Sequence, residues 1–553
     1  MGEPTPAARN AADPGHRYDV AVLGDHLSCG LLAAVLARQG LSVLLAGSGE
    51  PGEEAAGETT VPYTAEVFTL LARRYDVPEI AAFGLTSGLP AEVRRTSGVK
   101  RSLGFLYHHP DVAQRPEETV QFNVPGEHTE WHVYRPSADL HARSIALRHG
   151  AAAVPVRGLP VDVRVADDGV EIDAAGQTYR AEYVVDGSGP GSPLLARLRP
   201  ALSGDQELRH RSREISTHMR GVRPYEETVP KAAYPKASAF SHGTLHHICR
   251  DGWLQVVPFD NHPDSVNPLC SVTMSVEPDA FPRDLPAAEV FQRMIGRFPS
   301  VARQFEGAEA VRPWSDAPRR QRLVGPAAGR RYFLFERTAA RNDMFLSRDI
   351  TTGAETVHCL AAALIRAARE KDWDSVELKE AAAFQERLTL FNDTILAAAR
   401  GACASFPLWN AFSRVWLLWQ ILAALSLKQA RNACLAGGAG GAWTEVEHYA
   451  DGGLWFPAPK GLEALMADSF EDCVRVRDGR MDPDEAADRI FGRLRAAPLV
   501  PPLYRFASPR ARYYYFTLPR RLRTLLWTKT TAPPEFRHML TKENISAAPP
   551  AVE

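Results

Sequence analysis

Two pairs of adjacent histidines stand out among the residues that could do chemistry, His108–His109 and His246–His247. Imidazole has an ordinary pKa close to neutrality, so each of these side chains could donate or accept a proton during a reaction. We take His109 and His247, one from each pair, as catalytic candidates.

A glycine-rich segment follows the first apolar run of the chain. Residues 18–24 (YDVAVLG) are typical of a buried parallel strand, residues 31–40 of a helix ending at Gly40, and residues 41–47 of a second strand. A strand–helix–strand unit at the start of a long chain is the usual place for a dinucleotide-binding module. Gly24, at the end of the first strand, is its first cofactor-binding candidate.

The rest of the chain reads as further strands and then helices. Residues 169–189 predict a hairpin and a buried strand, residues 240–280 alternate as strands, and the pattern becomes helical from about residue 355. We expect an α/β fold in which a dinucleotide-binding, Rossmann-like unit is interleaved with a substrate-binding β-sheet over residues 18–400. A helical region would cover residues 401–540, with a disordered tail at 1–17 and a flexible tail at 541–553.

Composition excludes several classes of protein. The 553 residues carry 64 Lys+Arg against 66 Asp+Glu, a formal charge of -2, so the overall field does not favour nucleic acid. The seven cysteines lack paired spacing, which indicates reduced thiols and neither a disulfide framework nor a metal site. No apolar run is long enough to cross a bilayer. We expect a cytoplasmic protein.

Several ordered stretches carry a family resemblance. GTLHHICRDGWLQVVPFDNHP (243–263) resembles the tryptophan-containing segment of flavin-dependent halogenases, above all those that act on phenols and phloroglucinol-like rings. GETTVPYT (57–64), SLGFLYHH (102–109), VVDGSGPGSPL (184–194) and FLSRDITTGAE (345–355) match other parts of the same family, which is related to aromatic flavin monooxygenases. The resemblance reaches to about residue 470 and implies the fold of those enzymes.

The resemblance also assigns site residues. It places Arg135 on the cofactor and Asp186 at a strand end near the flavin ribityl chain. It implies an aromatic or polyketide-derived small molecule as substrate. The residues that it implies around the substrate pocket are Ser102, Phe105, Trp253, Gln255 and Pro258.

The flavin-binding fingerprint departs from the family pattern. The loop that should read G-x-G-x-x-G has His26 and Cys29 at its second and third glycine positions. An imidazole at position 26 would fill space that a diphosphate occupies, and Asp25 would compete for the donors at the helix start. Gly47 replaces the acid that binds ribose, and Asp349 replaces a glycine of the ring-binding loop.

The family's catalytic lysine, which carries the hypohalous species to the arene, would fall at Ser102. Lys100 lies two residues upstream, and residues two apart on a strand share a face. Lys100 is therefore the third catalytic candidate. The alternative is a solvated lysine in the basic stretch formed by Arg94, Arg95, Lys100 and Arg101.

Three functions remain open. The first is a natural-product tailoring enzyme that keeps the halogenase pocket but performs an acid–base or cyclisation-type reaction without a cofactor. The second is an FADH2-dependent halogenase of a phenolic substrate, with FAD as cofactor and Lys100 as its lysine. The third is a non-catalytic protein that binds a carrier protein or a partner enzyme.

The C-terminal segment is strongly basic. From Arg489 to Pro534 the chain has ten basic residues and no acid, interleaved with aromatic residues such as Tyr513 and Trp527. Such a segment suits an acidic acyl carrier protein or anionic lipids, although an ordinary basic helix packed on the body would look similar.

Overall fold

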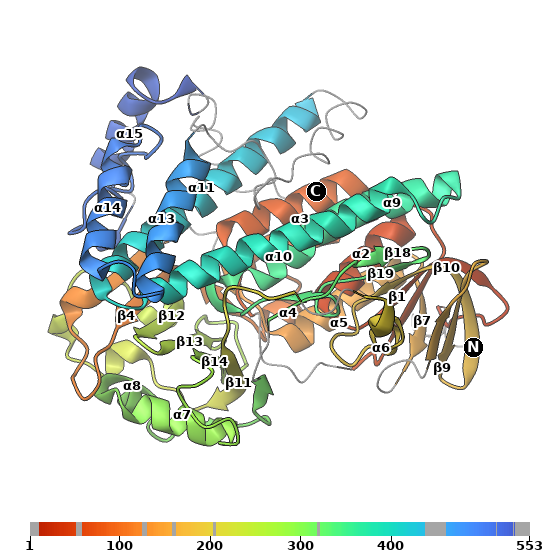
Figure 1. Ribbon diagram of the computed structural model, residues 1–553, viewed down its shortest axis with the longest axis horizontal. Helices are drawn as coiled ribbons and strands as arrows, with labels where there is room; N and C mark the ends of the chain where they lie inside the picture. Colours follow the sequence, from red (N-terminus) through yellow and green to blue (C-terminus); the bar gives the residue numbers. More distant parts are fainter. Residues whose placement is uncertain are drawn as a thin grey trace.

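The computed structural model describes residues 10–50, 58–123, 130–156, 162–202, 206–317, 321–436, 461–515, 517–534 and 536. Two sheets lie at opposite ends of the molecule, and long helices run across both of them (Figure 1). One sheet contains the strands of the predicted Rossmann-like unit, and the other contains the strands of the predicted substrate-binding sheet. The predicted α/β architecture is therefore confirmed.

The first sheet is the Rossmann-like one. Its strands are rich in Val, Leu and Ala and are buried on both faces, as parallel strands between helices must be. Helix α2 (Leu27–Arg38) follows the first strand directly. The parallel strands run in the order β19 (Tyr332–Leu334), β10 (Gln177–Asp186), β1 (Arg17–Leu23), β2 (Val43–Gly47) and β7 (Ala152–Pro155). At the margins lie β18 (Ala328–Gly329), β9 (Val170–Ala174) and β8 (Asp162–Val165).

The second sheet carries the tryptophan-containing segment on adjacent hairpin strands. Helices α7 (Ala287–Gly296) and α8 (Pro299–Gln304) cover one face, and the other face looks towards the long helices. Its strand order is β15 (Glu309–Ala310), β11 (Arg213–Arg220), β14 (Leu269–Val276), β13 (Gly252–Pro258), β12 (Thr244–Cys249), β4 (Ser102–Tyr107), β5 (Thr119–Asn123) and β21 (Tyr513–Tyr514). A separate two-stranded ribbon pairs β3 (Gly98–Lys100) with β6 (Glu130–His132).

The helices form a layer that joins the sheets. Trp409, Trp416 and Trp419 are fully buried on one of them. None of the described helices is long and apolar enough to span a membrane. The long helices α9 (Asp349–Glu370) and α10 (Val376–Ala402) run between the sheets (Figure 1). The other helices are α3 (Pro62–Tyr75), α5 (Arg135–Arg148), which packs on α2, α11 (Phe406–Ala436), α13 (Leu462–Arg477), α14 (Pro483–Ala496) and α15 (Leu518–Thr530).

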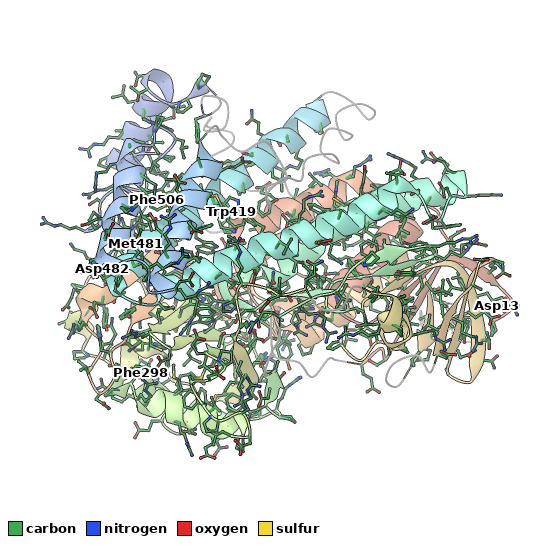
Figure 2. The ribbon with its side chains drawn as sticks, viewed as in Figure 1. Asp13, Phe298, Trp419, Met481, Asp482 and Phe506 are labelled. Carbon is green, nitrogen blue, oxygen red and sulfur yellow. The ribbon has the colours of Figure 1, made fainter. Side chains whose placement is uncertain are left out.

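One buried arginine ties α11 to the C-terminal segment. The Arg414 guanidinium, which is fully buried, donates to the carbonyls of Phe506 (2.9 Å), Ser508 (2.6 Å) and Ala511 (2.9 Å) and to Asn410 Oδ1. Phe506 lies among the helices, as Figure 2 shows. These bonds fix the chain just before β21.

The structure modifies some expected boundaries. Order begins before Tyr18, because the Ala12 amide donates to the Ala153 carbonyl at 3.2 Å beside β7. The boundary drawn at residues 400 and 401 falls inside α10, and the C-terminal region contributes β21 to the second sheet as well as helices. The predicted tail at 541–553 lies outside the described residues.

Candidate active site

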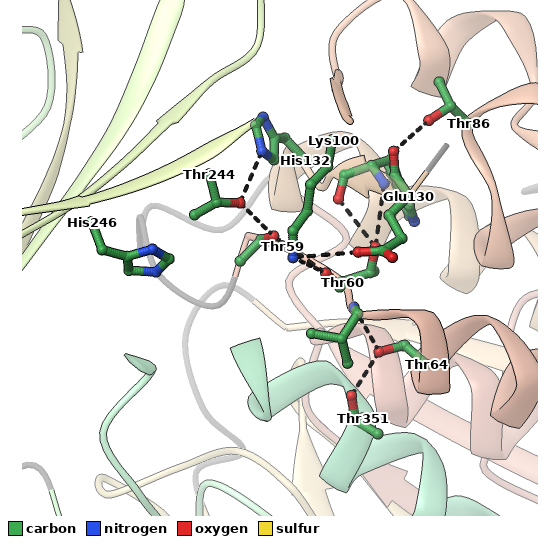
Figure 3. Close-up of polar contacts among 12 residues, drawn as sticks. Thr59, Thr60, Thr64, Thr86, Lys100, Glu130, His132, Thr244, His246 and Thr351 are labelled. Atoms are coloured by element: carbon green, nitrogen blue, oxygen red, sulfur yellow. Dashed lines mark hydrogen bonds and ion pairs between the residues drawn. The ribbon is translucent and has the colours of Figure 1, made fainter. Parts of the chain in front are cut away.

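Lys100 lies inside the protein, paired with an acid. Strands β3 and β6 place it opposite Glu130, and the two residues are only 1% and 3% exposed. Lys100 Nζ lies 3.4 Å from Glu130 Oε2 and also donates to the Thr60 carbonyl (Figure 3). The structure therefore excludes a solvated Lys100.

Burial brings the pKa values of this pair towards each other. Burial lowers the pKa of the Lys100 amine from its ordinary value, although Glu130 opposes the shift. Burial likewise raises the pKa of Glu130 to about 7, against the stabilising charge of Lys100. Both groups can therefore exchange protons closer to neutrality than they would in water.

A chain of hydroxyl groups runs beside the pair. Burial lowers the pKa of His132 to about 3, so its imidazole is neutral. Its Nδ1 lies 2.7 Å from the Pro258 carbonyl and must carry the proton, so Nε2 accepts from the Thr244 hydroxyl at 3.1 Å. Thr244 in turn accepts from Thr59 at 3.2 Å. Figure 3 shows the bonds from His132 to Thr244 and from Thr244 to Thr59. Through Thr244 and the Pro258 carbonyl, this chain ties β12 and β13 to the ribbon that carries Lys100.

A cavity of about 100 Å³ opens on this pair. Its wall is mainly apolar and aromatic, and among the described residues Lys100 and Glu130 are its only ionisable side chains apart from two tyrosines. A flat apolar ligand would therefore meet an amine and a carboxylate on one side. The wall comprises Val61, Pro62, Lys100, Leu103, Phe122, Asn123, Glu130, Trp416, Leu417, Gln420, Ile421, Tyr504 and Tyr514.

The other expected pocket residues lie beside this cavity and do not line it. Trp253 stacks on Phe345 with ring centroids 4.1 Å apart, and Phe105 stacks on His246 at 4.8 Å. Gln255 Nε2 lies 3.2 Å from His246 Nε2. Trp253, Phe105 and His246 form a buried aromatic layer between the second sheet and the segment that contains Phe345, and Gln255 contacts this layer through His246.

Ser102 and Pro258 are also set back from the cavity. Ser102 is 1% exposed and its side chain lies against Gly243, and Pro258 enters the site through its carbonyl. The substrate-pocket roles of these residues stay predictions.

The two histidine candidates lie away from Lys100. His247 faces the opposite side of the sheet, under α7 and α8, with Nδ1 2.9 Å from His108 Nε2 and Nε2 2.7 Å from Gln304. Burial lowers the pKa of His247 to about 4. His109 is partly exposed and pairs with Glu118 at 2.8 Å. Neither lines the cavity, and their catalytic roles stay predictions.

The diphosphate cradle of the Rossmann-like unit is filled by protein. The His26 side chain lies buried at the start of α2, with Nε2 3.1 Å from Cys29 Sγ and Nδ1 3.4 Å from Glu336 Oε1. A Cβ on Gly187 would lie 2.6 Å from His26 Nε2, which shows how tightly the ring fits. Burial holds the pKa of His26 well below its ordinary value, so a neutral ring stands where a phosphate would bind.

The ribose position is filled as well. The Asp25 carboxylate accepts from the Ser48 amide (2.5 Å), the Ser48 hydroxyl (2.8 Å) and the Gly49 amide (3.3 Å). A Cβ at position 47 would collide with this carboxylate. A side chain at position 47 would therefore require the Asp25 carboxylate to move.

Arg135 and Asp186, the other cofactor candidates, are engaged inside the protein. Arg135 Nε donates to Asp139 at 2.8 Å and its Nη1 lies 3.6 Å from Asp349, while Asp139 also accepts the first amide of α2 at 3.0 Å. Asp186 accepts from the Ser188 amide at 2.9 Å and from two hydroxyl groups. Two donors that would face a diphosphate, the Arg135 guanidinium and the Leu27 amide, are therefore already engaged with carboxylates.

These residues do not fit FAD in the manner expected of the fold. The start of α2 presents a neutral imidazole and carboxylates where a dianion should bind, and burial raises the pKa of the adjacent Glu336 to about 7. The nearby charges of Arg337, Arg135 and Arg341 add to burial in lowering the pKa of His26. The cavity along residues 336–349 measures about 30 Å³, room for one or two waters. Within the described residues, no cluster of three or more His, Cys, Asp or Glu could hold a metal ion.

Sequence reasoning missed the partners of the candidates. Glu130 and His132 carry no motif, and Thr244 lies in the tryptophan-containing segment without being singled out there. Only the pairing of β3 with β6 and of β4 with β12 brings them to Lys100. Glu336 was also missed. Its position seven residues before Asp343, in the loop where flavin contacts were expected, was the one available signal.

Comparisons with known proteins agree on one family. The chain is 30% identical to the tetracycline 7-halogenase of Kitasatospora aureofaciens over 96% of each protein. It is also 30% identical to the monodechloroaminopyrrolnitrin halogenase PrnC of Pseudomonas fluorescens, over 97% of this chain and 95% of that protein. No protein-family profile matches the sequence.

A solved structure supports the same assignment. The crystal structure of halogenase PltM in complex with phloroglucinol and FAD superposes with a TM-score of 0.83 and 26% identity, covering 90% of this chain and 99% of that one. The fold that the resemblance implied is thus confirmed. The chain belongs to the flavin-dependent halogenase family.

Proposed function

We propose that the protein halogenates an aromatic substrate in the cavity beside Lys100 and Glu130. The observation that carries the proposal is the buried Lys100–Glu130 pair at the wall of an apolar cavity. Two relatives of nearly equal length are named as halogenases, and PltM was solved with phloroglucinol. These relatives favour halogenation over the cofactor-independent reaction that the sequence suggested first, and favour an enzyme over a non-catalytic binder.

Lys100 would present the halogen and Glu130 would take the proton. Hypohalous acid (HOX) is the co-reactant, held by a hydrogen bond from the Lys100 amine or as a haloamine formed with loss of water. The ring carbon forms the bond to X, and the electron pair of the O–X or N–X bond leaves with oxygen or nitrogen. The ring proton passes to the Glu130 carboxylate, so the sum is ArH + HOX giving ArX + H₂O.

We further propose that this hypohalous acid does not come from FAD bound in the diphosphate cradle. FAD is a cofactor of the family, and PltM was solved with it. What supports this is that the His26 ring, the Asp25 carboxylate and Glu336 are engaged with one another's neighbours at the start of α2, where the fold's glycine loop would approach the diphosphate. The halogen source is thus either flavin acting elsewhere or another catalyst.

The test is an assay of purified protein on a panel of phenols with chloride or bromide. One arm supplies oxygen, free FAD and a flavin reductase, and the other supplies dilute hypohalous acid. The proposal expects a single halogenated isomer by mass spectrometry in at least one arm, above the protein-free background. An absence of halogenated product in both arms, or an isomer mixture equal to background, would contradict it.

A second candidate remains an acid–base reaction on the same ring without halide. The observation that favours it is the filled cradle combined with the pKa of Glu130 near 7. A product of unchanged mass that forms without halide or oxidant would establish it in place of halogenation.

A further inference from the structure

A second, strongly basic hollow lies near the C-terminus. Its volume is about 490 Å³, which exceeds that of the substrate cavity. Five cations line it, and we call it the basic pocket: Lys236, Arg505, Arg510, Arg512 and Arg520.

Among the described residues, none of these five cations forms an ion pair with a carboxylate. Two of them donate to carbonyls instead, Arg512 to Pro116 (2.7 Å) and Arg520 to Tyr515 (2.9 Å). Burial and the nearby Arg505 charge lower the pKa of Arg520. Five like charges around one hollow repel each other, and an anion there would relieve the repulsion.

The walls suit an organic anion better than a simple ion. Tyr513 and Tyr515 flank the cations, and planar guanidinium groups bind phosphate through paired hydrogen bonds. Arg505 has φ +53°, a left-handed conformation that is uncommon outside glycine and is frequent at ligand sites. Tyrosine faces and several arginines together recognise a phosphate attached to a larger group.

The basic pocket adjoins the substrate cavity. Successive side chains of a strand point to opposite sides, so Tyr514 lines the substrate cavity while Tyr513 and Tyr515 line the basic pocket. Asn123, another wall of the substrate cavity, donates to the Tyr514 carbonyl at 3.1 Å. Since β21 ends the sheet order, a flexible arm could pass around that edge from one hollow to the other.

We propose that the basic pocket binds the phosphate of an arm that carries the aromatic substrate, of the phosphopantetheine type. Its connection to the substrate rests on the proposed function, whereas phosphate binding itself does not. A coenzyme A thioester and the prosthetic arm of a carrier protein both contain such a phosphopantetheine group, and either could be the ligand.

Calorimetric titration with four probes tests the proposal: coenzyme A, 4′-phosphopantetheine, pantetheine and inorganic pyrophosphate. Both phosphorylated arms should bind and pantetheine should not. Binding should weaken at least tenfold between 50 and 500 mM NaCl, because the contacts are charged. Coenzyme A binding tenfold tighter than 4′-phosphopantetheine assigns the pocket to a coenzyme thioester, and equal affinities assign it to a carrier arm. Pyrophosphate binding without arm binding would overturn the proposal.

Charge reversal locates the site. Arg505→Glu and Arg520→Glu should each weaken binding at least tenfold, whereas Arg523→Glu, on the same helix as Arg520 but outside the pocket, should change it less than threefold. Equal losses in all three variants would indicate a diffuse basic surface and overturn the proposal. Wild-type binding to phosphatidylserine vesicles that is as tight as its binding to the phosphorylated probes would do the same. The titrations contain no oxidant and no aromatic substrate, so their failure leaves halogenation untouched. Thermal unfolding midpoints confirm that each variant folds.

Discussion

At the scale of single residues, the Lys100–Glu130 pair is the feature with the most direct consequences. Both side chains are withdrawn from water and each is the other's nearest opposite charge. Removing Lys100 or Glu130 therefore changes the protonation of the residue that remains. A measurement of protonation or of product can thus distinguish a chemical role of the pair from a purely structural one.

Lys100→Met should abolish halogenation while keeping most of the side-chain volume. The loss should exceed 100-fold in product formed, because methionine can neither donate a hydrogen bond to hypohalous acid nor form a haloamine. Arg101→Met is the matched control, since Arg101 is the exposed neighbour. Product yield is followed by mass spectrometry, and retention of activity in Lys100→Met would remove Lys100 from the mechanism.

Glu130 should also make stability depend on pH. Its pKa is about 7 in the folded protein and near 4.5 when unfolded, so its stabilising contribution is complete below pH 4.5 and disappears as pH rises through 7. Glu130→Gln should reduce the difference in free energy of unfolding between pH 5 and pH 8 by about 2–3 kcal/mol. Urea unfolding at both pH values measures this, with exposed Glu309→Gln as control. An undiminished difference would show that Glu130 is not the titrating group.

The sequence predicted some of these residues and could not predict others. The spacing of Lys100 to Ser102 predicted Lys100 as a candidate, but its counter-charge, Glu130, lies on a strand thirty residues further along the chain. Histidine type alone proposed His247, yet strand alternation sends His246 to the aromatic layer and His247 to the opposite core. The packing of the sheet decides whether His246 or His247 faces the aromatic layer. The residues around the two histidines in the sequence do not reveal how the sheet packs.

At the scale of elements, the unit β1–α2–β2 is a cofactor fold whose cradle is occupied. Its strands and helix were predicted from apolar periodicity, and they pair as a Rossmann-like unit must. The altered glycines were visible in the sequence. The internal bonds that replace ligand contacts were not, because Asp139, Glu336 and Asp349 come from distant segments.

FAD affinity should increase when the cradle is reopened. We expect the wild-type chain to bind oxidised and reduced FAD more weakly than micromolar, and the double variant His26→Gly/Cys29→Gly to bind at least tenfold tighter. Restored glycines remove the ring from the diphosphate space, and one recovered polar contact is worth roughly 1–3 kcal/mol. Fluorescence titration measures both, with exposed His16→Gly as control. Micromolar or tighter binding to the wild type would return FAD to its usual role.

At the scale of the whole molecule, the substrate cavity is assembled from both ends of the chain. Val61 and Lys100 contribute one wall, and Tyr504 and Tyr514 contribute another. The two-residue strand β21 was not predictable, because so short a strand has no periodicity and its partner lies almost 400 residues upstream. The cavity therefore depends on how firmly the C-terminal segment is fastened to α11.

Arg414→Met should loosen that fastening. It leaves three backbone carbonyls and Asn410 without their buried donor, which should lower the free energy of unfolding by about 3 kcal/mol or more. Hydrogen exchange across residues 503–514 should accelerate more than in the first sheet. Arg495→Met, exposed on α14, is the control. Unchanged hydrogen exchange across residues 503–514 in Arg414→Met would show that Arg414 does not hold the segment.

Strand β21 is synthesised long after its partner β5, which affects folding during translation. During translation, β5 is synthesised about 390 residues before the strand that completes its edge. At roughly 5–20 residues per second, that edge stays open on the ribosome for about 20–80 seconds. An open edge is a template for pairing with a neighbouring nascent chain. A chain that terminates early would expose this edge permanently, so chaperone demand and aggregation of truncated products should concentrate at β5.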